Sequence, residues 1–363
     1  MTGPVAAPAL TRIPVPRTLD GDEARLFRAI AEIGTAVCRK DAGHDHLDHT
    51  AQELLPSWQE QIDRTQVGYA VEAGDEVLGV VTTVHQNGDA PRSLEFDLLV
   101  APDRWGEGVE EMLLAAAEDE ARRHGIPVVQ TYTLHRADTP GEKLVPATGW
   151  GSVPADDRQT RLMVAHGYAL EQVERNSVLD LREPLPLVEA MLAEALVAAG
   201  PDYRPLAWTL PTPDEWVEKI AYPISRMSTD VPAGDLVWDE EVWDAARVRR
   251  RDARLQAAGT TVSVSAVLHE PSGTIVAYNE LALAGPADSA TSQWGTLVLR
   301  EHRGHRLGTV VKCANLLRWR EVAPRSPFVS TFNAEENRPM LDINEAIGFV
   351  GVSVAGAWQK TLD

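Results

Sequence analysis

The sequence has few cysteines and no long apolar run, and each scarcity excludes a class of protein. Only Cys38 and Cys313 occur among 363 residues, which excludes a disulfide framework. No apolar run approaches the roughly 18 residues that indicate a transmembrane helix. The N-terminal segment MTGPVAAPALTRIPVP is interrupted by proline and lacks the apolar core of an export signal. These features predict a cytoplasmic protein.

Basic residues are also scarce relative to acidic ones. The chain has 34 lysines and arginines against 54 aspartates and glutamates, a formal net charge of −20. A nucleic-acid partner requires a basic face, so none is expected, and neither is a membrane partner. An acidic protein attracts cationic small molecules. A hydrophobic fraction of 44% is typical of a globular chain, and this length predicts two domains.

One stretch, residues 294–312 (WGTLVLREHRGHRLGTVVK), predicts a phosphate-binding turn. It has the pattern of a strand, a short cationic turn and a helix that opens near Gly308. The first N–H groups of a helix have no partner within it, and the helix dipole is positive there. Such a turn therefore binds phosphate, and two arginines and a histidine add charge for several phosphates. The stretch has no Walker-type Gly-Lys-Ser/Thr, which argues against a nucleotide hydrolase.

The segment RGHRLG resembles the pyrophosphate loop of the GNAT acyltransferases, Q/R-x-x-G-x-G/A. Arg303 and Gly308 match the first and last positions, whereas Arg306 replaces the usual middle glycine. Downstream, NRPMLDINEAIGF resembles the family's Asn-led helix ending in Gly-Phe. The resemblance implies acetyl-CoA as the acyl donor and no metal. It implies contacts with the donor from Leu297, Val298, Leu299, Arg303, Gly304, His305, Arg306, Leu307, Gly308, Thr309, Asn333 and Asn337. For Asn337, helix capping is the alternative.

The order of predicted elements is repeated along the chain, which indicates a duplication. It resembles that of the tandem GNAT enzymes, to which mycothiol synthase belongs. We expect an α/β protein with two GNAT-like domains, each a mixed, mostly antiparallel twisted sheet flanked by helices. The expected limits are residues 1–183 for a degenerate N-terminal domain, 184–201 for a connecting helix and 202–363 for a C-terminal domain with the acyl-CoA site.

The corresponding turn of the N-terminal half, PDRWGEGVEEML, carries carboxylates where the ligand would be anionic. Aligned on the C-terminal turn, Gly108 corresponds to Arg306 and Glu110 to Gly308. Like charges a few ångströms from a diphosphate cost several kcal/mol at an effective dielectric constant of about 20. The sequence therefore predicts that the first half does not bind the donor, unless Glu107 and Glu110 point to solvent.

Acyl transfer to an amine requires a group that accepts a proton and a way to stabilise the leaving thiolate. Glu280 is the acid within the otherwise neutral strand AYNELALA, and it is the candidate base; binding of the substrate ammonium or exposure to solvent are its alternatives. Asn344 matches the position of a tyrosine in many family members. Its amide can donate a hydrogen bond to the thiolate but cannot supply a proton. Tyr222 and Tyr278 are further candidates for that proton.

The acceptor is expected to meet carboxylates and tryptophans in residues 228–243, which in the family line the acceptor side. Carboxylates beside tryptophan faces suit a cationic or amino-sugar substrate. Asp239, Glu240 and Glu241 have an alternative role as first-turn acids of a helix. The candidate substrate-binding residues are Asp230, Asp235, Trp238 and Trp294.

The sequence thus predicts an acetyl-CoA-dependent N-acyltransferase for a primary amine of a cationic small molecule, of antibiotic or amino-sugar type. Two alternatives remain: a non-catalytic acyl-CoA-binding or scaffold protein, because Arg306 and Asn344 replace the usual residues, and an acyltransferase with a donor other than acetyl. A duplicated chain can make internally the contact that single-domain relatives make by dimerising. We therefore expect a monomer or a loose homodimer.

Overall fold

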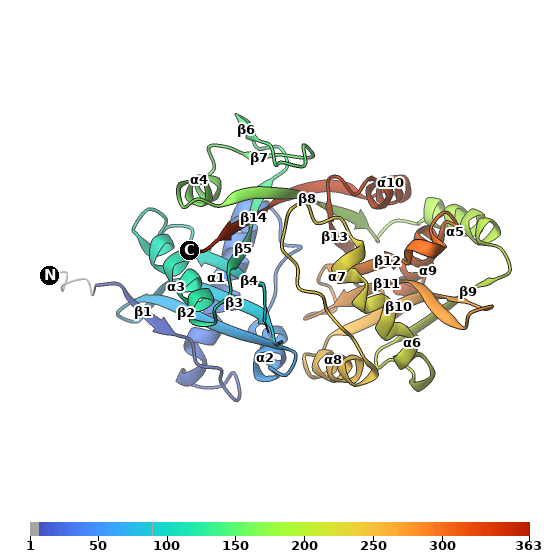
Figure 1. The fold of residues 1–363 in the computed structure, drawn as a ribbon, viewed down its shortest axis with the longest axis horizontal. Coiled ribbons are helices and arrows are strands. Elements are labelled where there is room, and N and C mark those ends of the chain that lie inside the picture. The colour runs from blue at the N-terminus through green and yellow to red at the C-terminus, as the bar shows by residue number, and fades with distance from the viewer. Residues whose placement is uncertain (1–6, 89) are drawn as a thin grey trace. The chain divides into compact units, whose positions relative to one another are not determined.

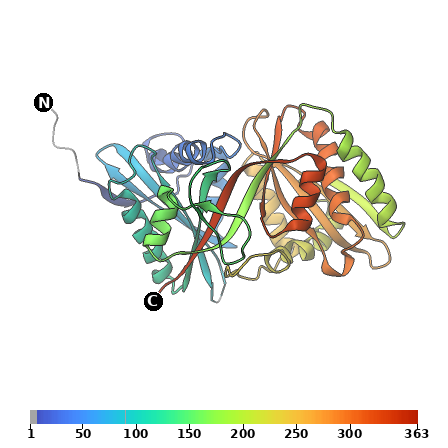
Figure 2. The same cartoon turned by 90° about the horizontal axis from the view of Figure 1, so that it is seen from above.

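The computed structural model describes residues 7–88 and 90–363, which form two compact units (Figures 1 and 2). The first unit comprises the chain up to Glu174, together with Gly234–Asp239 and Ser353–Asp363. The second comprises Arg175–Ala233 and Glu240–Val352. The limits predicted at residues 183 and 201 stay a prediction. They do not anticipate that two later segments, including the last strand, belong to the first unit.

Each unit is a mixed, mostly antiparallel sheet with helices, as predicted. In the first unit the strands are β1 (Ala9–Arg12), β2 (Arg64–Ala73), β3 (Glu76–Gln86), β4 (Ser93–Val100), β5 (Val128–Arg136) and, from Ser353, β14 (Val350–Thr361), in that spatial order. Its helices are α1 (Arg25–Ala42), α2 (Ala51–Gln59), α3 (Val109–Arg123) and α4 (Arg158–Ala165). The pair β6 (Lys143–Leu144) and β7 (Val153–Pro154) forms a separate hairpin.

Alternate side chains of β2 enter two different cores, because successive residues of a strand face opposite sides of the sheet. Val71 packs with Leu113 of α3, whereas its neighbour Ala70 packs with Phe27 of α1. Helices therefore cover both faces of this sheet, which explains why its central strands are apolar with little alternation.

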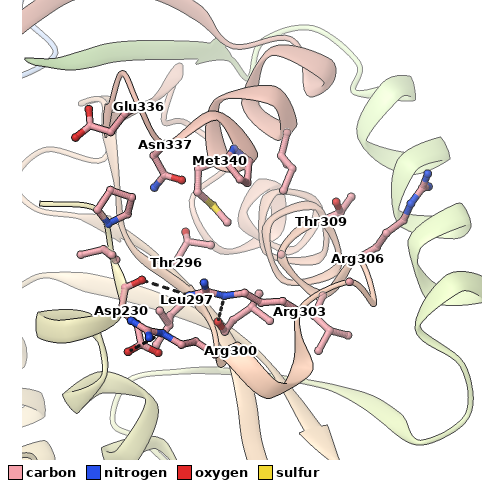
Figure 3. Close-up of a pocket in the computed structure, with 18 residues that line it drawn as sticks. Asp230, Thr296, Leu297, Arg300, Arg303, Arg306, Thr309, Glu336, Asn337 and Met340 are labelled. Carbon is pink, nitrogen blue, oxygen red and sulfur yellow. Dashed lines mark hydrogen bonds and ion pairs between the residues drawn. The ribbon is translucent and has the colours of Figure 1, made fainter. Parts of the chain in front are cut away.

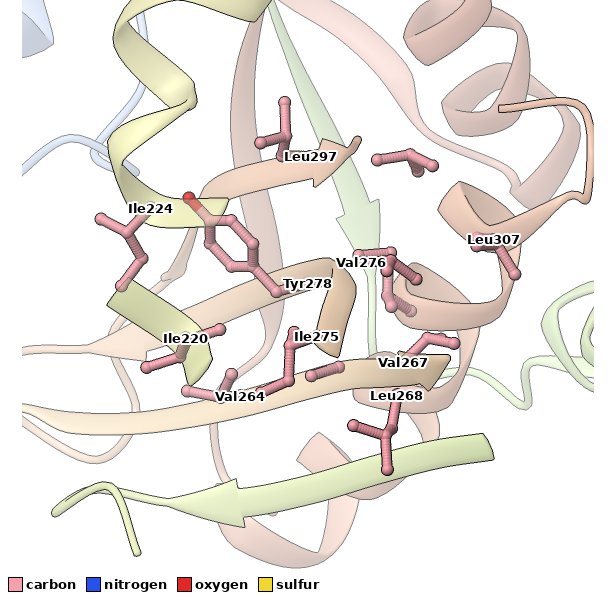
Figure 4. Packing of buried hydrophobic residues seen from close by; sticks show 14 of the residues in the cluster. Ile220, Ile224, Val264, Val267, Leu268, Ile275, Val276, Tyr278, Leu297 and Leu307 are labelled. Carbon is pink, nitrogen blue, oxygen red and sulfur yellow. The ribbon is translucent and has the colours of Figure 1, made fainter. Parts of the chain in front are cut away.

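The second unit repeats this arrangement. Its strands β13 (Phe328–Ala334), β12 (Thr291–Val298), β11 (Thr274–Leu283), β10 (Thr261–His269) and β9 (Tyr203–Thr209) lie in that order, and β8 (Ala169–Asp180) enters this unit at Arg175. Its helices are α5 (Pro186–Ala199), α6 (Asp214–Ser225), α7 (Met227–Asp230), α8 (Ala245–Ala257), α9 (Leu307–Val322) and α10 (Arg338–Ile347). Figure 4 shows part of the core between α6, the strands and the start of α9.

One helix begins later than the sequence-based prediction. A helix was expected from Glu240, but α8 begins at Ala245 because the Asp244 side chain accepts the N–H of Arg247 and caps the helix there. The proposed role of Asp239, Glu240 and Glu241 as first-turn acids is therefore wrong. Among the described residues, no helix combines the length and apolar character needed to cross a membrane.

In both units the two parallel strands pair only near their beginnings. β12 pairs with β13 at Thr291 and Ser292 alone, and β4 pairs with β5 only as far as Phe96. Beyond these points the strands are no longer joined by main-chain hydrogen bonds. This leaves a wedge in the sheet, and in the second unit the candidate site lies beside it.

Candidate functional site

The turn after β12 brings backbone N–H groups to one end of a cavity. A short 3-10 helix, Arg300–His302, follows the strand, and α9 begins at Leu307. Gly304 has φ +91°, and Arg306, the N-cap residue of α9, has φ +55° and ψ +21°. Arg306 is the non-glycine residue with positive φ in the described part of the chain. Its backbone thus keeps the left-handed conformation expected of the glycine that it replaces.

This conformation costs a residue with a Cβ roughly 1–2 kcal/mol. The corresponding residue of the first unit, Gly108, is the N-cap of α3 with φ +84°. The two turns therefore share one backbone geometry, which agrees with their sequence alignment. Strain of this kind is retained where a side chain has a use. Within residues 7–88 and 90–363, the Arg306 guanidinium pairs only with the exposed Glu194, at 3.3 Å.

The cavity has a volume of about 750 Å³ and is lined by residues from β12, the turn, α7, α9 and α10 (Figure 3). The lining residues are Asp230, Val231, Pro232, Thr296, Leu297, Val298, Arg300, Arg303, Gly304, Arg306, Leu307, Gly308, Thr309, Glu336, Asn337, Pro339, Met340 and Ile343. This volume is typical of pockets for small molecules and cofactors.

Positive charge is concentrated at the turn. Arg303 donates to the main-chain oxygens of Val298, at 3.2 Å, and Asp230, at 3.3 Å. The buried Asp230 carboxylate pairs with Arg226 and lies 3.5 Å from Nε of Arg300. Asp230 thus orients the arginines around the cavity, and it does not offer a free carboxylate to a substrate.

The wall along α10 is apolar. A Cβ on Gly308 would lie 3.4 Å from both Ile343 Cδ1 and Met340 Cε, at ordinary contact distance, so the start of α9 lies directly against the side chains of α10. Leu307 and Pro339 extend this surface. The cavity therefore combines a cationic end with an apolar wall, a combination that fits a diphosphate with a long, weakly polar arm.

Nine of the twelve residues predicted to contact the donor line the cavity. Three do not. Leu299 is buried, the exposed His305 packs against Tyr203 with ring centroids 5.0 Å apart, and Asn333 pairs with Asn344. The prediction missed Arg300, Thr296 and the apolar residues of α10. Arg300 directly follows the strand and could have been found from that position, whereas Met340 and Ile343 come from a distant segment.

Asn344 lies in a buried polar group with Lys312. Nζ of Lys312 donates to Oδ1 of Asn344 at 2.7 Å, and Nδ2 of Asn344 donates to Oδ1 of Asn333 at 2.7 Å. Lys312 is fully buried, and burial lowers its pKa to about 7. Asn344 is 1% exposed and does not line the cavity. Its role toward the leaving thiolate stays a prediction, and no sequence pattern pointed to Lys312.

Glu280 lies on β11 in a two-pronged ion pair with Arg251 of α8, with N–O distances of 2.8 and 2.7 Å. The Arg251 guanidinium also lies 5.7 Å from the ring centroid of Trp294. To act as a base, Glu280 would have to lose this pairing, so its catalytic role stays a prediction without support from the geometry. The Arg251 side chain is 13% exposed, so this guanidinium is held inside the second unit by its pairing with Glu280.

The remaining candidates are distributed over both units. Asp235 and Trp238 lie in Gly234–Asp239, which belongs to the first unit, whereas Asp230 and Trp294 belong to the second. Tyr222 is exposed on α6. Tyr278 lies in the core of the second unit, where burial raises its pKa well above the usual value, so it is a poor proton donor near neutral pH (Figure 4).

The turn of the first unit is closed by its own side chain. Oε1 of Glu110 accepts the N–H of Gly106 at 2.7 Å, and Glu110 is 5% exposed. An N–H that could bind phosphate is therefore occupied by a carboxylate. The alternative that Glu110 points to solvent is wrong for this residue.

Comparison with known proteins relates this geometry to a family. Residues 34–140 match the family described as acetyltransferase (GNAT). One similar solved structure is the "Tandem GNAT protein from the clavulanic acid biosynthesis pathway". It superposes with a TM-score of 0.72 at 22% identity, and the match covers 97% of this chain and 98% of that protein. The chain has a tandem GNAT fold.

A second solved structure agrees with this assignment. The GCN5-related N-acetyltransferase from Sphaerobacter thermophilus has a TM-score of 0.58 at 17% identity and covers 97% of this chain and 95% of its own. No curated protein sequence matches. The predicted resemblance to tandem GNAT proteins is confirmed, and the family match with the fold supports an N-acetyltransferase. The family match falls on the first unit, the half with the closed turn.

Proposed function

We propose that this tandem GNAT protein transfers the acetyl group of acetyl-CoA to a primary amine of a cationic small molecule, and that the second unit binds acetyl-CoA. The observation that carries the proposal is the cavity beside the β12–β13 wedge. The N–H groups at the start of α9, with Arg300, Arg303 and Arg306, fit the diphosphate. The apolar wall formed by Pro339, Met340 and Ile343 fits the pantetheine arm.

The first unit is proposed to support the fold and not to bind the donor. The Glu110 carboxylate, which accepts the Gly106 N–H, lies where a phosphate would have to lie. Two negative groups at that distance repel by several kcal/mol at an effective dielectric constant near 20. One donor per chain follows from this asymmetry.

The acidic balance of the chain, a formal net charge of −20, supports a cationic acceptor because it attracts positively charged small molecules. The proposed location is the cytoplasm, and the proposed assembly is a monomer or loose homodimer.

The test measures donor binding by calorimetry and release of CoA thiol with a panel of primary amines. We expect one acetyl-CoA per chain and thiol release with polycationic amines. The double charge reversal R303E/R306E should weaken binding at least 100-fold, because it replaces two attractive charges with two repulsive ones. R320E, at the exposed end of the same helix α9, is the control and should leave binding intact.

Three outcomes would contradict parts of the proposal. Unchanged binding by R303E/R306E would place the donor elsewhere. Two donors per chain would show that the first unit also binds. Binding without thiol release for every amine would favour the alternative of an acyl-CoA-binding protein, and release only with longer acyl donors would favour an acyltransferase of another specificity.

A further inference from the structure

A chain of buried polar side chains crosses the core of the second unit and ends at the cavity. Oγ of Ser263 lies 2.7 Å from Oδ1 of Asn315, Nδ2 of Asn315 lies 2.8 Å from Oδ1 of Asn279, and Nδ2 of Asn279 lies 2.8 Å from Oγ1 of Thr296. Ser263, Asn315 and Asn279 are fully buried, on β10, α9 and β11. Thr296, on β12, is half-buried and lines the cavity (Figure 3).

The direction of every hydrogen bond in this chain is fixed by chemistry. Nδ2 of Asn315 contacts the main-chain oxygens of Ser263, at 3.0 Å, and Asn279, at 3.2 Å. Carbonyl oxygens only accept, so this atom must be the NH₂ group and Oδ1 must face Ser263. Asn279 must then turn its oxygen toward Asn315, because two NH₂ groups cannot bond each other. Its own NH₂ group therefore donates to Thr296.

Thr296 consequently has an unused hydrogen. Its oxygen accepts from Asn279, so its O–H cannot donate back along the chain. No acceptor for this O–H occurs among residues 7–88 and 90–363. A hydroxyl has one hydrogen to donate, and because Thr296 lines the cavity, a bound ligand can accept it.

We propose that Thr296 donates a hydrogen bond to the thioester carbonyl oxygen of the bound acyl donor, and that Ser263, Asn315 and Asn279 are positioning residues that aim this hydroxyl. The inference rests on the proposed function, since it requires the donor in this cavity. When the amine nitrogen attacks the carbonyl carbon, the C=O electron pair moves to oxygen. The O–H of Thr296 stabilises that negative charge without giving up its proton. Collapse then breaks the C–S bond and releases the CoA thiolate. The nitrogen loses one proton to water and the thiolate takes one up, so that the products are the amide and the CoA thiol.

A purely structural role explains only part of this series of hydrogen-bonded side chains. The register of β11 against β12 shifts between Asn279 and Leu281, where Asn279 pairs with Thr296 but Leu281 pairs with Gln293. Asn315 compensates there by donating to the main-chain oxygen of Asn279. This compensation does not require a hydroxyl at residue 296, so the two roles predict different effects of removing it.

The first experiment replaces the hydroxyl with a methyl group of similar size, in T296V. We expect kcat to fall about 100-fold, the usual effect of removing one such donor, while CoA binding is unchanged. T296S should restore most of the turnover lost in T296V. T274V, an exposed threonine at the start of β11, is the control for the substitution itself.

The second experiment reverses the last hydrogen bond in N279D. An ionised aspartate still accepts from Asn315 but draws the Thr296 hydrogen toward itself and away from the cavity. Relative to the wild type, N279D should lose turnover as pH rises through the pKa of the new carboxyl. Adding T296V to N279D above that pKa should cause little further loss, because both changes remove the same interaction.

The third measurement does not depend on turnover. Infrared spectra of bound acetyl-CoA labelled at the carbonyl carbon should show a lower C=O stretching frequency in the wild type than in T296V. Equal frequencies and equal kcat would overturn the inference about Thr296 while CoA binding remained. Failure of the proposed function would instead appear as unchanged donor binding in R303E/R306E.

Discussion

Lys312 illustrates how a single buried charge affects stability. Its pKa is lowered to about 7 by burial, from an ordinary value of 10.5. Between these values the unfolded chain binds a proton that the folded protein does not, so the free energy of unfolding rises with pH in this window. Below pH 7 both states are protonated and the full penalty of burying the charge remains.

We therefore expect K312M to be more stable than the wild type at pH 7. The advantage should decrease by roughly 1.4 kcal/mol per pH unit between pH 7 and 10, since only the wild type titrates. Loss of the donor to Asn344 Oδ1 offsets the gain by about 1–3 kcal/mol. Urea unfolding at several pH values measures the difference. K219M, at an exposed position of α6, is the control, and equal pH slopes in K312M and the wild type would contradict the assignment.

At the residue scale, the sequence predicted what is contiguous and missed what is assembled from distant segments. Arg303, Arg306 and Gly308 were predicted because a phosphate-binding turn is formed by residues that are consecutive in the sequence. The pairing of Glu280 with Arg251 was missed because 29 positions separate them. The sequence of helix α8 also shows no apolar pattern that would predict a buried arginine. Thr296 is one of many threonines until its partner Asn279 is known.

At the element scale, substitutions at the N-terminus of α9 measure how the strained residue Arg306 affects donor binding and stability. Arg306 is left-handed, a conformation that glycine adopts freely and alanine does not. We expect R306G and R306A to weaken acetyl-CoA binding equally, because both remove the same charge. R306G should be more stable than R306A by about 1 kcal/mol, because only alanine keeps the strain.

Thermal unfolding and calorimetry of the two variants separate these effects. Equal stability would show that Arg306 leaves the left-handed region in solution. Unequal binding would show that backbone geometry at this turn, and not the guanidinium, determines affinity. The same substitution at Gly108, G108A, should lower stability in the first unit by a similar amount.

Elements with strong periodicity were predicted well, and their ends less so. The connecting helix predicted within residues 184–201 is α5, and the helix ending in Gly-Phe is α10, whose last turn is followed by Gly348 with φ +103°. The start of α8 was predicted five residues too early, because Glu240 and Glu241 resemble first-turn acids until Asp244 is seen to cap. The wedge between β12 and β13 could not be predicted from the sequence, because it depends on the residue at which the two strands cease to pair.

At the scale of the whole molecule, the last strand belongs to the first unit. Ser353–Thr361 of β14 pair with Arg136–Val128 of β5, residue for residue. Removing residues 353–363 would leave β5 with an unpaired edge, which exposes main-chain groups and promotes aggregation. We expect this truncated chain to lose the protection of the β5 amides in hydrogen exchange and to be cleaved within the first unit by trypsin.

A shorter deletion provides the control. Removal of residues 362–363 alone takes away the hydrogen bond from Leu362 N–H to the oxygen of Pro127 and the packing of the Leu362 side chain. It keeps every residue pair between β5 and β14, so exchange in β5 should stay slow. Slow exchange in the longer deletion as well would show that the first unit closes its sheet without β14.

The return of β14 to the first unit also has a consequence for biosynthesis. A ribosome completes β1 to β5 early but delivers their neighbour β14 only after β6 to β13 have been made. During that interval, the nascent first unit must wait with an open edge, while the second unit already has β9 to β13. Until β14 emerges, this edge presents unpaired main-chain groups to other nascent chains, and shielding it would favour correct folding.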